Sequence, residues 1–158
     1  MIDFTIQAFQ ELGMEILFSK VDIKPGKPTT FGKLDNCLVI NLPGNPLAAM
    51  VNFEMFVKPT ILKLSGTDSF YHPVITTKMA DEYKIKAGKN SVVLGVWSGK
   101  DFTPIPNQKP GMVSPMALAD GMIVTTKEID RLEKDREVLM IPIKIDIQSN
   151  IEEDFFIR

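Results

Sequence analysis

The sequence contains one cysteine, one histidine and one tryptophan among 158 residues, and these scarcities exclude several classes of protein. The single cysteine, Cys37, leaves no disulfide framework and no thiol cluster for a metal ion. No apolar run approaches the roughly 20 residues that cross a bilayer, and the start of the chain lacks the basic and apolar segments of a signal peptide. A net charge of -2 argues against a sequence-independent nucleic-acid binder. We therefore expect a cytoplasmic protein with neither a membrane nor a nucleic-acid partner.

What is present is an ordinary share of apolar and charged residues, 44% and 24%, in a chain long enough for one medium domain or two small ones. The residues up to Gly66 have the patterns of helices and strands, whereas those after His72 are short β-branched runs separated by Gly, Asn and Pro. We predict an α/β part over residues 1–67, a linker over 68–73 and a β part over 74–158.

The centre of the first part is a predicted strand over 37–42, followed by a tight loop and a helix that begins at Pro46. The run Leu38-Val39-Ile40 lacks polar alternation, which predicts a strand covered on both faces. Asn45 can cap the helix through its side-chain oxygen, and Pro46 suits the first helical position. A helix start at a sheet edge presents free N–H groups, so this corner is a candidate anion site.

Local signals predict the neighbouring elements. Residues 4–12 have the spacing of a helix that Gly13 ends, residues 16–21 form a strand, and residues 29–33 pair with the central strand as a hairpin. Residues 1–66 offer at most three strands and two helices, too few to cover both faces of the central strand. Either another chain supplies the missing layer or these residues are half of a larger domain. In the helix after the corner, we expect a kink or two abutting helices at Pro59, and a stripe that packs in the core. The stripe consists of Met50, Phe53, Val57, Ile61 and Leu64.

Lysines gather before the central strand, at positions 20, 24, 27 and 33 of an otherwise slightly acidic chain. The Pro-Gly turn between Lys24 and Lys27 directs cations outward, where they could hold phosphate or another oxyanion. The alternative is a solvated turn with incidental lysines. Asp3 also has two interpretations, as the cap of the first helix or as a carboxylate at the edge of a site.

In the second part we predict five strands and a short helix that form a small antiparallel barrel or sandwich. The strands lie near 74–79, 91–97, 101–105, 122–126 and 138–147. Ser114 caps the short helix and Gly121 ends it. His72, in the linker, is more simply a hinge residue than a metal ligand, and Trp97 is a core or rim aromatic.

Four motifs occur in a specific order: Lys24-Pro25-Gly26-Lys27-Pro28, Phe31-Gly32, Leu42-Pro43-Gly44-Asn45-Pro46 and Lys63-Leu64-Ser65-Gly66. They resemble the motifs of the molybdopterin molybdenumtransferase family, which includes the carboxyl-terminal domain of gephyrin. The resemblance continues in the second part, at Ser114 and residues 118–124. It implies the second half of a three-layer α/β/α domain of the molybdopterin-binding type, followed by a small antiparallel β-barrel domain.

The resemblance implies a transferase of molybdenum cofactor biosynthesis, which inserts molybdate into adenylylated molybdopterin with Mg²⁺ and releases AMP. By position, Asp3, Lys20 and Lys24 match catalytic residues, and Asp3 is also the expected metal ligand. The residues that match the substrate-binding positions are Lys27, Pro43, Gly44, Asn45 and Pro46. Part of the family's pocket precedes the position of Asp3, so we expect these residues alone to be inactive and to belong to a longer chain.

Two alternatives stay open. One is a non-catalytic scaffold of the gephyrin type, in which the barrel is the contact surface. The other is nucleotidyl transfer, because the molybdopterin adenylyltransferases share the α/β core; the barrel argues against it, since those relatives usually have a single domain. The resemblance further implies a homodimer in the full-length protein and contacts with molybdopterin adenylyltransferase or with recipient enzymes.

Overall fold

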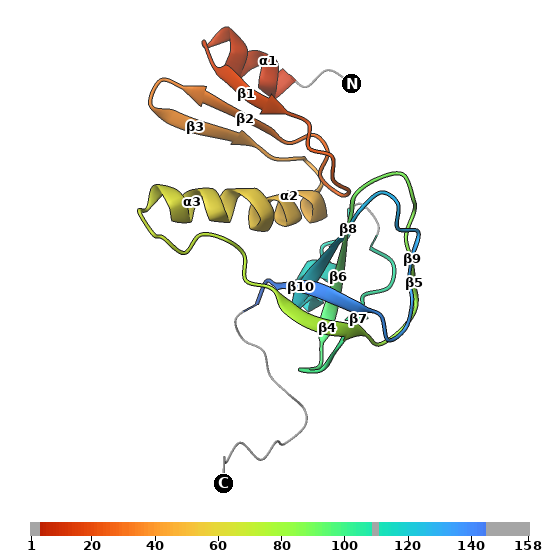
Figure 1. Cartoon of the computed structure of the whole chain (residues 1–158). Coiled ribbons are helices and arrows are strands. Elements are labelled where there is room, and N and C mark those ends of the chain that lie inside the picture. Colours follow the sequence, from red (N-terminus) through yellow and green to blue (C-terminus); the bar gives the residue numbers. More distant parts are fainter. Residues whose placement is uncertain (1–3, 109–110, 145–158) are drawn as a thin grey trace.

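The computed structural model describes residues 4–108 and 111–144, which form a helix-and-sheet unit followed by a barrel (Figure 1). The first unit begins with helix α1 (Phe4–Glu11), which confirms the helix predicted over 4–12. Gly13 follows it with a φ of +93°, in the left-handed region that favours glycine. Helix α1 lies on one side of a small sheet, and a longer helical rod lies on the other (Figure 1).

The sheet has three antiparallel strands in the order β1 (Glu15–Ser19), β2 (Thr30–Leu34) and β3 (Cys37–Asn41). Strands β2 and β3 form the predicted hairpin, in which Leu34 pairs with Cys37. The layers of helix, sheet and helix agree with the expected α/β/α architecture. The first unit is thus built by short-range pairing of neighbouring segments.

The expectation that the strand over 37–42 is a central strand covered on both faces is wrong for the described residues, since no residue of β3 is buried although helices lie on both sides of the sheet. Within 4–108 and 111–144, β2 is the one strand that pairs with β3, so β3 is an edge strand. Cys37 is exposed, and Leu38 retains 42% of its accessible surface. An apolar strand sequence indicates that other residues should bury the strand, but it does not indicate which residues these are.

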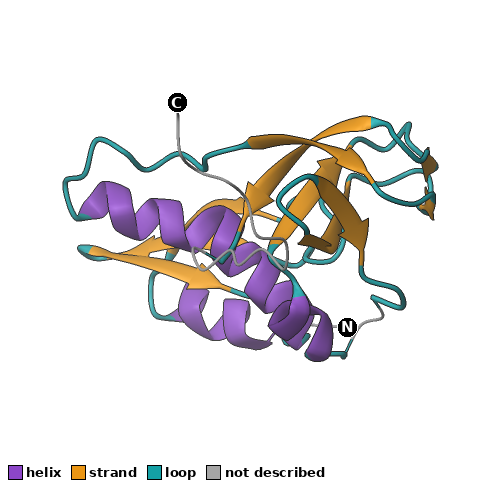
Figure 2. Ribbon diagram, turned by 90° about the horizontal axis from the view of Figure 1, so that it is seen from below, coloured by secondary structure: helices purple, strands orange, loops and turns teal. Residues whose placement is uncertain are grey.

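The helical rod consists of three abutting segments, α2 (Pro46–Asn52), the π-helical η1 (Phe53–Val57) and α3 (Lys58–Leu64). They run on without a gap (Figure 2). Pro59 falls in the first turn of α3, where its missing N–H needs no partner. Of the two alternatives expected near Pro59, abutting helices are confirmed. In η1 the hydrogen bonds widen, since the Lys58 N–H donates to the Phe53 carbonyl.

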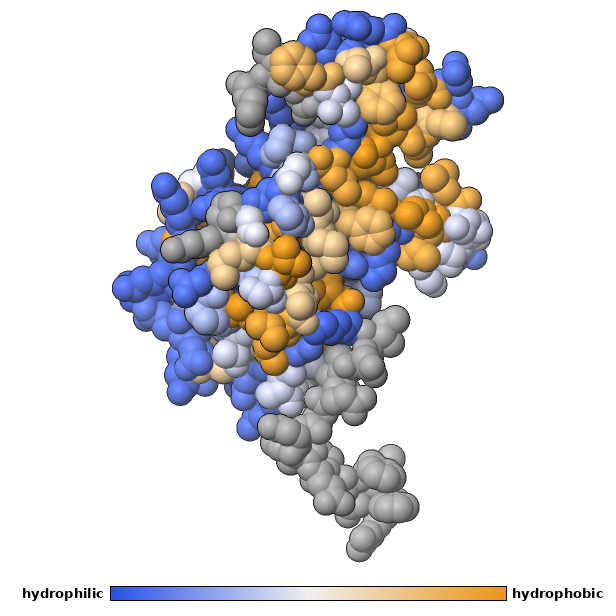
Figure 3. Space-filling view, turned by 180° about the vertical axis from the view of Figure 1, so that it is seen from behind, coloured by the Kyte–Doolittle hydropathy of each residue, from blue (hydrophilic) through white to orange (hydrophobic). Residues whose placement is uncertain are grey.

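The predicted core stripe of the rod is wrong for four of its five members, and the fifth, Val57, is half-buried. Met50, Phe53, Ile61 and Leu64 are exposed, with Leu64 at 69%. The buried positions of α2 are instead Leu47, Ala48, Val51 and Asn52. Helical periodicity identified an apolar face, but the barrel packs against a different one, and apolar side chains gather on the surface (Figure 3).

The second unit is a closed barrel with strand order β10-β4-β7-β6-β8, which confirms the predicted small barrel. Its strands are β4 (Ile75–Met79), β6 (Ser91–Trp97), β7 (Asp101–Pro104), β8 (Gly121–Thr125) and β10 (Glu137–Pro142). All pairings are antiparallel except that of β4 with β7. A further pair, β5 (Tyr83–Lys84) and β9 (Arg131–Leu132), was not predicted.

Two boundaries in the barrel differ from the prediction. Helix α4 (Ser114–Leu118) is preceded by Val113 as its N-cap, without a side-chain cap from Ser114. Gly121 opens β8 rather than ending α4. Strand β10 ends at Pro142, which cannot donate a ladder hydrogen bond, and residues 145–147 of the predicted strand lie outside the described residues.

Two clusters of buried side chains form the cores. One fills the barrel, around Met79, Phe102 and Met140, all without accessible surface. The other joins the units, because Leu47 and Val51 of α2 pack with barrel residues. Its other buried members are Ile23, Val92, Leu94, Ile105, Ala119 and Met122. Each fully buried side chain of this size contributes about 1.5–3 kcal/mol, so the shared cluster fixes α2 on the barrel.

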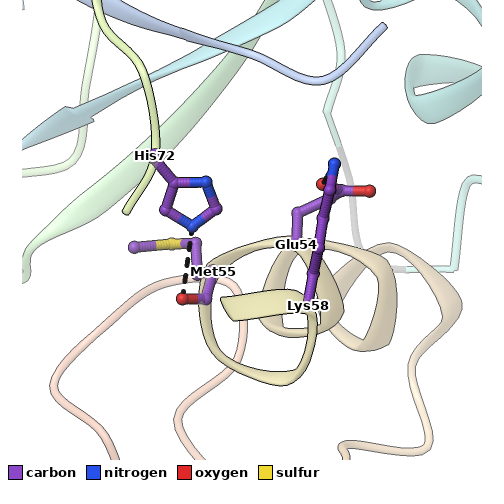
Figure 4. Close-up of polar contacts among 4 residues, drawn as sticks. All are labelled: Glu54, Met55, Lys58 and His72. Carbon is purple, nitrogen blue, oxygen red and sulfur yellow. Dashed lines mark hydrogen bonds and ion pairs between the residues drawn. The ribbon is translucent and has the colours of Figure 1, made fainter. Parts of the chain in front are cut away.

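The single histidine and the single tryptophan both form structural contacts. His72 extends from the linker toward the rod, with Nε2 3.4 Å from the Met55 carbonyl oxygen (Figure 4). Beside it, Lys58 pairs with Glu54 at 2.8 Å. Trp97 is half-buried, and its Nε1–H donates to Thr77 Oγ1 at 3.2 Å. Trp97 is therefore a rim aromatic of the barrel.

Candidate anion-binding cleft

A cleft of about 700 Å³ lies between the two units. Its walls are the basic loop, defined here as residues 22–28, the corner before α2, and the barrel segment from β5 to the start of β6. Five lysines line it: Lys24, Lys27, Lys84, Lys86 and Lys89. Among the described lining residues, Asp22 is the single carboxylate. The cleft thus combines residues far apart in sequence into one cationic surface.

The basic loop has a defined shape because a side chain of α2 is hydrogen-bonded to it. The buried Asn52 side chain donates from Nδ2 to the Gly26 carbonyl at 2.9 Å and to Thr29 Oγ1 at 2.7 Å. Thr29 Oγ1 in turn donates to the Gly26 carbonyl at 2.9 Å. Gly26 has a φ of +128°, and a Cβ there would collide with the Asn52 amide. Only glycine satisfies both conditions without displacing Asn52.

The corner before α2 has the predicted cap. Asn45 Oδ1 accepts from the Ala48 N–H at 3.2 Å, and Pro46 occupies the first turn. Pro43, which is buried, Gly44 and Asn45 line the cleft. The corner therefore places the start of α2 at the wall of the cleft.

The structure brings five of the predicted site residues into the cleft: Lys24, Lys27, Pro43, Gly44 and Asn45. Lys20 and Pro46 are exposed but are not among the lining residues. Asp3 lies outside the described residues. The predicted site is thus assembled in part, around the two lysines of the Pro-Gly turn.

Sequence reasoning missed three cleft lysines, Lys84, Lys86 and Lys89, which the barrel contributes. Their close spacing was visible in the sequence, but only the packing of the barrel on α2 turns them toward the basic loop. Tyr83 also lines this wall, and burial raises the pKa of its hydroxyl.

The donor set of the cleft suits an anion. Lysine ammonium groups are compact positive charges with three N–H donors each, well matched to phosphate or oxometalate oxygens. A divalent cation such as Mg²⁺ needs several oxygen ligands. No group of three or more His, Cys, Asp or Glu that could hold a metal ion occurs in the described part of the chain. The described cleft is therefore suited to an oxyanion and does not by itself provide a magnesium site.

The fold and the cleft define a class of protein in which an α/β unit and a small β-barrel enclose a cationic pocket. The family model of the probable molybdopterin binding domain matches residues 2–63, and that of the MoeA C-terminal region, domain IV, matches residues 76–143. Together with the relatives described below, these two matches support a MoeA-type fragment. No helix in residues 4–108 or 111–144 has the length and apolarity to span a membrane.

The curated relatives are named molybdopterin molybdenumtransferase. A molybdopterin molybdenumtransferase of Staphylococcus epidermidis is 30% identical over 127 residues, which cover 77% of this chain and 30% of the relative. The Haemophilus influenzae enzyme is 45% identical over 71 residues, covering 45% of this chain and 17% of the relative. The matches thus span less than a third of the relatives' length.

Solved structures agree. The molybdopterin biosynthesis MoeA protein of Pyrococcus horikosii superposes with a TM-score of 0.78 and 25% identity over 90% of this chain and 35% of that chain. A molybdenum cofactor biosynthesis protein of Pyrococcus furiosus shares the fold, with a TM-score of 0.72 and 20% identity over 89% and 55% of the respective chains. The arrangement of both units is therefore that of the family.

Proposed function

We propose that the cleft forms part of the active site of a molybdopterin molybdenumtransferase, which inserts molybdate into adenylylated molybdopterin and releases AMP. The observation that carries the proposal is the cationic cleft built around the family motifs, with Lys24 and Lys27 on one wall and barrel lysines on the other. Because the chain spans less than a third of the curated relatives, we assign the complete reaction to a longer chain that includes these residues.

The proposed roles follow from charge and position. Molybdate is a dianion, and the bond that releases AMP is a phosphoanhydride, so both substrates need cations close to their oxygens. Lys24 and Lys27 supply these cations at the basic loop, and Lys20 does so from outside the described cleft. The residues proposed to shape the pterin-binding wall are Pro43, Gly44, Asn45 and Pro46.

Magnesium is a separate part of the proposal. The described cleft offers Asp22 as its single carboxylate, and the Asn90 amide already donates to it at 3.2 Å. We therefore propose Asp3, which lies outside the described residues, as the magnesium ligand and derive no step through the metal. A cytoplasmic location, a homodimer of the longer chain and contacts with an adenylyltransferase or a recipient enzyme complete the proposal.

The test is molybdate-dependent AMP release from adenylylated molybdopterin by the longer protein. Lys24→Ala removes a cation proposed to stabilise the reacting oxyanions, and Asp3→Ala removes the proposed magnesium ligand, so each should lower kcat/KM by about 10²-fold. Lys33→Ala is the matched control, since Lys33 is an exposed lysine of β2 outside the cleft. Undiminished turnover in both Lys24→Ala and Asp3→Ala would overturn the site assignment.

A further inference from the structure

We propose that Asn90, at the start of the barrel strand β6, is a positioning residue for Lys24, and that the barrel thereby sets the geometry of the anion site. The proposal rests on the proposed function of the cleft. Asn90 does not line the cleft, so its effect on a bound anion must pass through the basic loop.

The backbone of Lys24 is held by the barrel. Its N–H donates to the Asn90 carbonyl at 2.8 Å, and its carbonyl accepts from the Val92 N–H at 2.8 Å. Lys24 and Ser91 form an isolated parallel bridge between these bonds. Both polar backbone groups of Lys24 are therefore engaged by β6 and its start, which fixes the point from which the lysine side chain extends.

The side chain of Asn90 adds a second connection. Its Nδ2 donates to the Asp22 carbonyl at 2.9 Å and to Asp22 Oδ2 at 3.2 Å. Its Oδ1 accepts from the Lys127 N–H at 3.0 Å. The opposite orientation of the amide would place an oxygen against two acceptors, so these partners specify one orientation. One amide thus ties the basic loop to the segment that follows β8.

The same contact also holds the Asp22 carboxylate at the wall of the cleft. Among the described residues, Asp22 takes part in no ion pair, and its carboxylate is satisfied by the Asn90 amide instead. A carboxylate held in this way forms no ion pair with a described lysine of the cleft. Releasing it would let Asp22 compete with a bound oxyanion for the ammonium group of Lys24.

The two lysines of the turn are held by different units. Asn90 fixes the Lys24 end of the basic loop from the barrel, whereas Asn52 of α2 fixes the Gly26 end, next to Lys27. Loss of the Asn90 side chain removes its bonds to Asp22 and from Lys127 and leaves the backbone bonds of Lys24 and the Asn52 contacts in place. It should therefore loosen the Lys24 end of the loop through Asp22. This asymmetry separates a positioning role from general destabilisation.

The experiment uses the 158-residue chain and two readouts. Hydrogen exchange follows the five amides of the basic loop that are not those of proline, at residues 22, 23, 24, 26 and 27, and calorimetric titration with sodium molybdate measures anion affinity. The variants are Asn90→Ala and Asn90→Asp, which leaves an acceptor for Lys127 but places a second carboxylate beside Asp22. Thr77→Val is the matched control, because it removes two barrel hydrogen bonds, to the Lys100 carbonyl and from Trp97, away from the cleft.

We expect both Asn90 variants to exchange the amides of the basic loop at least tenfold faster and to bind molybdate at least tenfold more weakly. Thr77→Val should lower the melting temperature without either change. Unaltered exchange in Asn90→Ala, or equal effects in Thr77→Val, would overturn the positioning role. If the unsubstituted chain binds no molybdate, the proposed function of the cleft fails, while the exchange data still decide whether Asn90 positions Lys24.

Discussion

The barrel buries a core of apolar side chains within its own sheet, whereas the helix-and-sheet unit leaves many of its apolar side chains exposed. The barrel closes on itself, so each of its five strands pairs on both sides around a core that includes Phe102 and Met140. The three-stranded sheet keeps an open edge at β3, and apolar side chains such as Leu38 and Leu64 stay exposed. Closure satisfies backbone and side chains together, whereas an open sheet depends on cover from elsewhere.

The difference explains how the cleft is built. Cleft residues of the first unit are shaped by contacts with the second unit and with α2, not by the sheet itself. Val51 and Leu47 join the shared core, and Lys24 bonds to the start of β6. The closed barrel therefore acts as the rigid support on which the basic loop is arranged.

The largest expected effect is in the barrel core. Phe102→Ala removes a ring without accessible surface that packs over Gly95, and should cost about 3–5 kcal/mol of unfolding free energy. Leu38→Ala, at the exposed edge β3, should change it by less than about 0.5 kcal/mol. Denaturant unfolding followed by Trp97 fluorescence measures both, and similar losses for the two variants would contradict the contrast between the units.

A smaller effect is expected at the basic loop. Gly26→Ala introduces a Cβ at a φ of +128°, against the Asn52 amide, and should cost about 1–3 kcal/mol. Gly44→Ala is the matched control, because a Cβ at Gly44 would meet nothing within 4 Å and the φ of this residue is not in the left-handed region. Thermal unfolding compares them, and equal melting temperatures would show that the loop is not held by α2.

The smallest effect concerns Tyr83 on the barrel wall of the cleft. Burial raises the pKa of its hydroxyl in the folded state above the ordinary 10.0. The free energy of unfolding should therefore decrease as the pH rises, because the unfolded chain releases its proton first. That stability is complete below the unfolded-state pKa and should fall as the pH rises through the folded-state pKa, since only the unfolded chain ionises readily. Tyr83→Phe should weaken this alkaline loss in urea unfolding at about pH 9 and about pH 11, on either side of the ordinary tyrosine pKa; an identical loss would contradict it.

Short sequence motifs, such as a helix cap or a hairpin turn, predicted the local structure correctly. The Asn45 cap with Pro46 and the hairpin of β2 and β3 follow from short-range hydrogen bonding. Strands β5 and β9 were missed because two residues carry no periodicity. Apolar periodicity also failed to say which face of the rod the barrel covers, because that depends on contacts between distant segments.

In the cleft, too, residues close together in the sequence were predicted, and residues brought there by packing of the two units were not. Lys24 and Lys27 were identified from their density around the Pro-Gly turn and from the family motifs. The barrel lysines at 84, 86 and 89 were not, because their approach to the loop depends on how the two units pack. Lys20 was predicted from the same density, yet the path of the chain leaves it outside the lining.

The central claim is that lysines of both units bind one anion in the shared cleft. Calorimetric titration with molybdate should show that Lys24→Ala and Lys86→Ala each weaken binding by about tenfold or more, as expected for lost charged hydrogen bonds. Lys33→Ala should bind as the unsubstituted chain does. Unchanged affinity in Lys86→Ala, with binding lost in Lys24→Ala, would confine the site to the first unit and contradict the account.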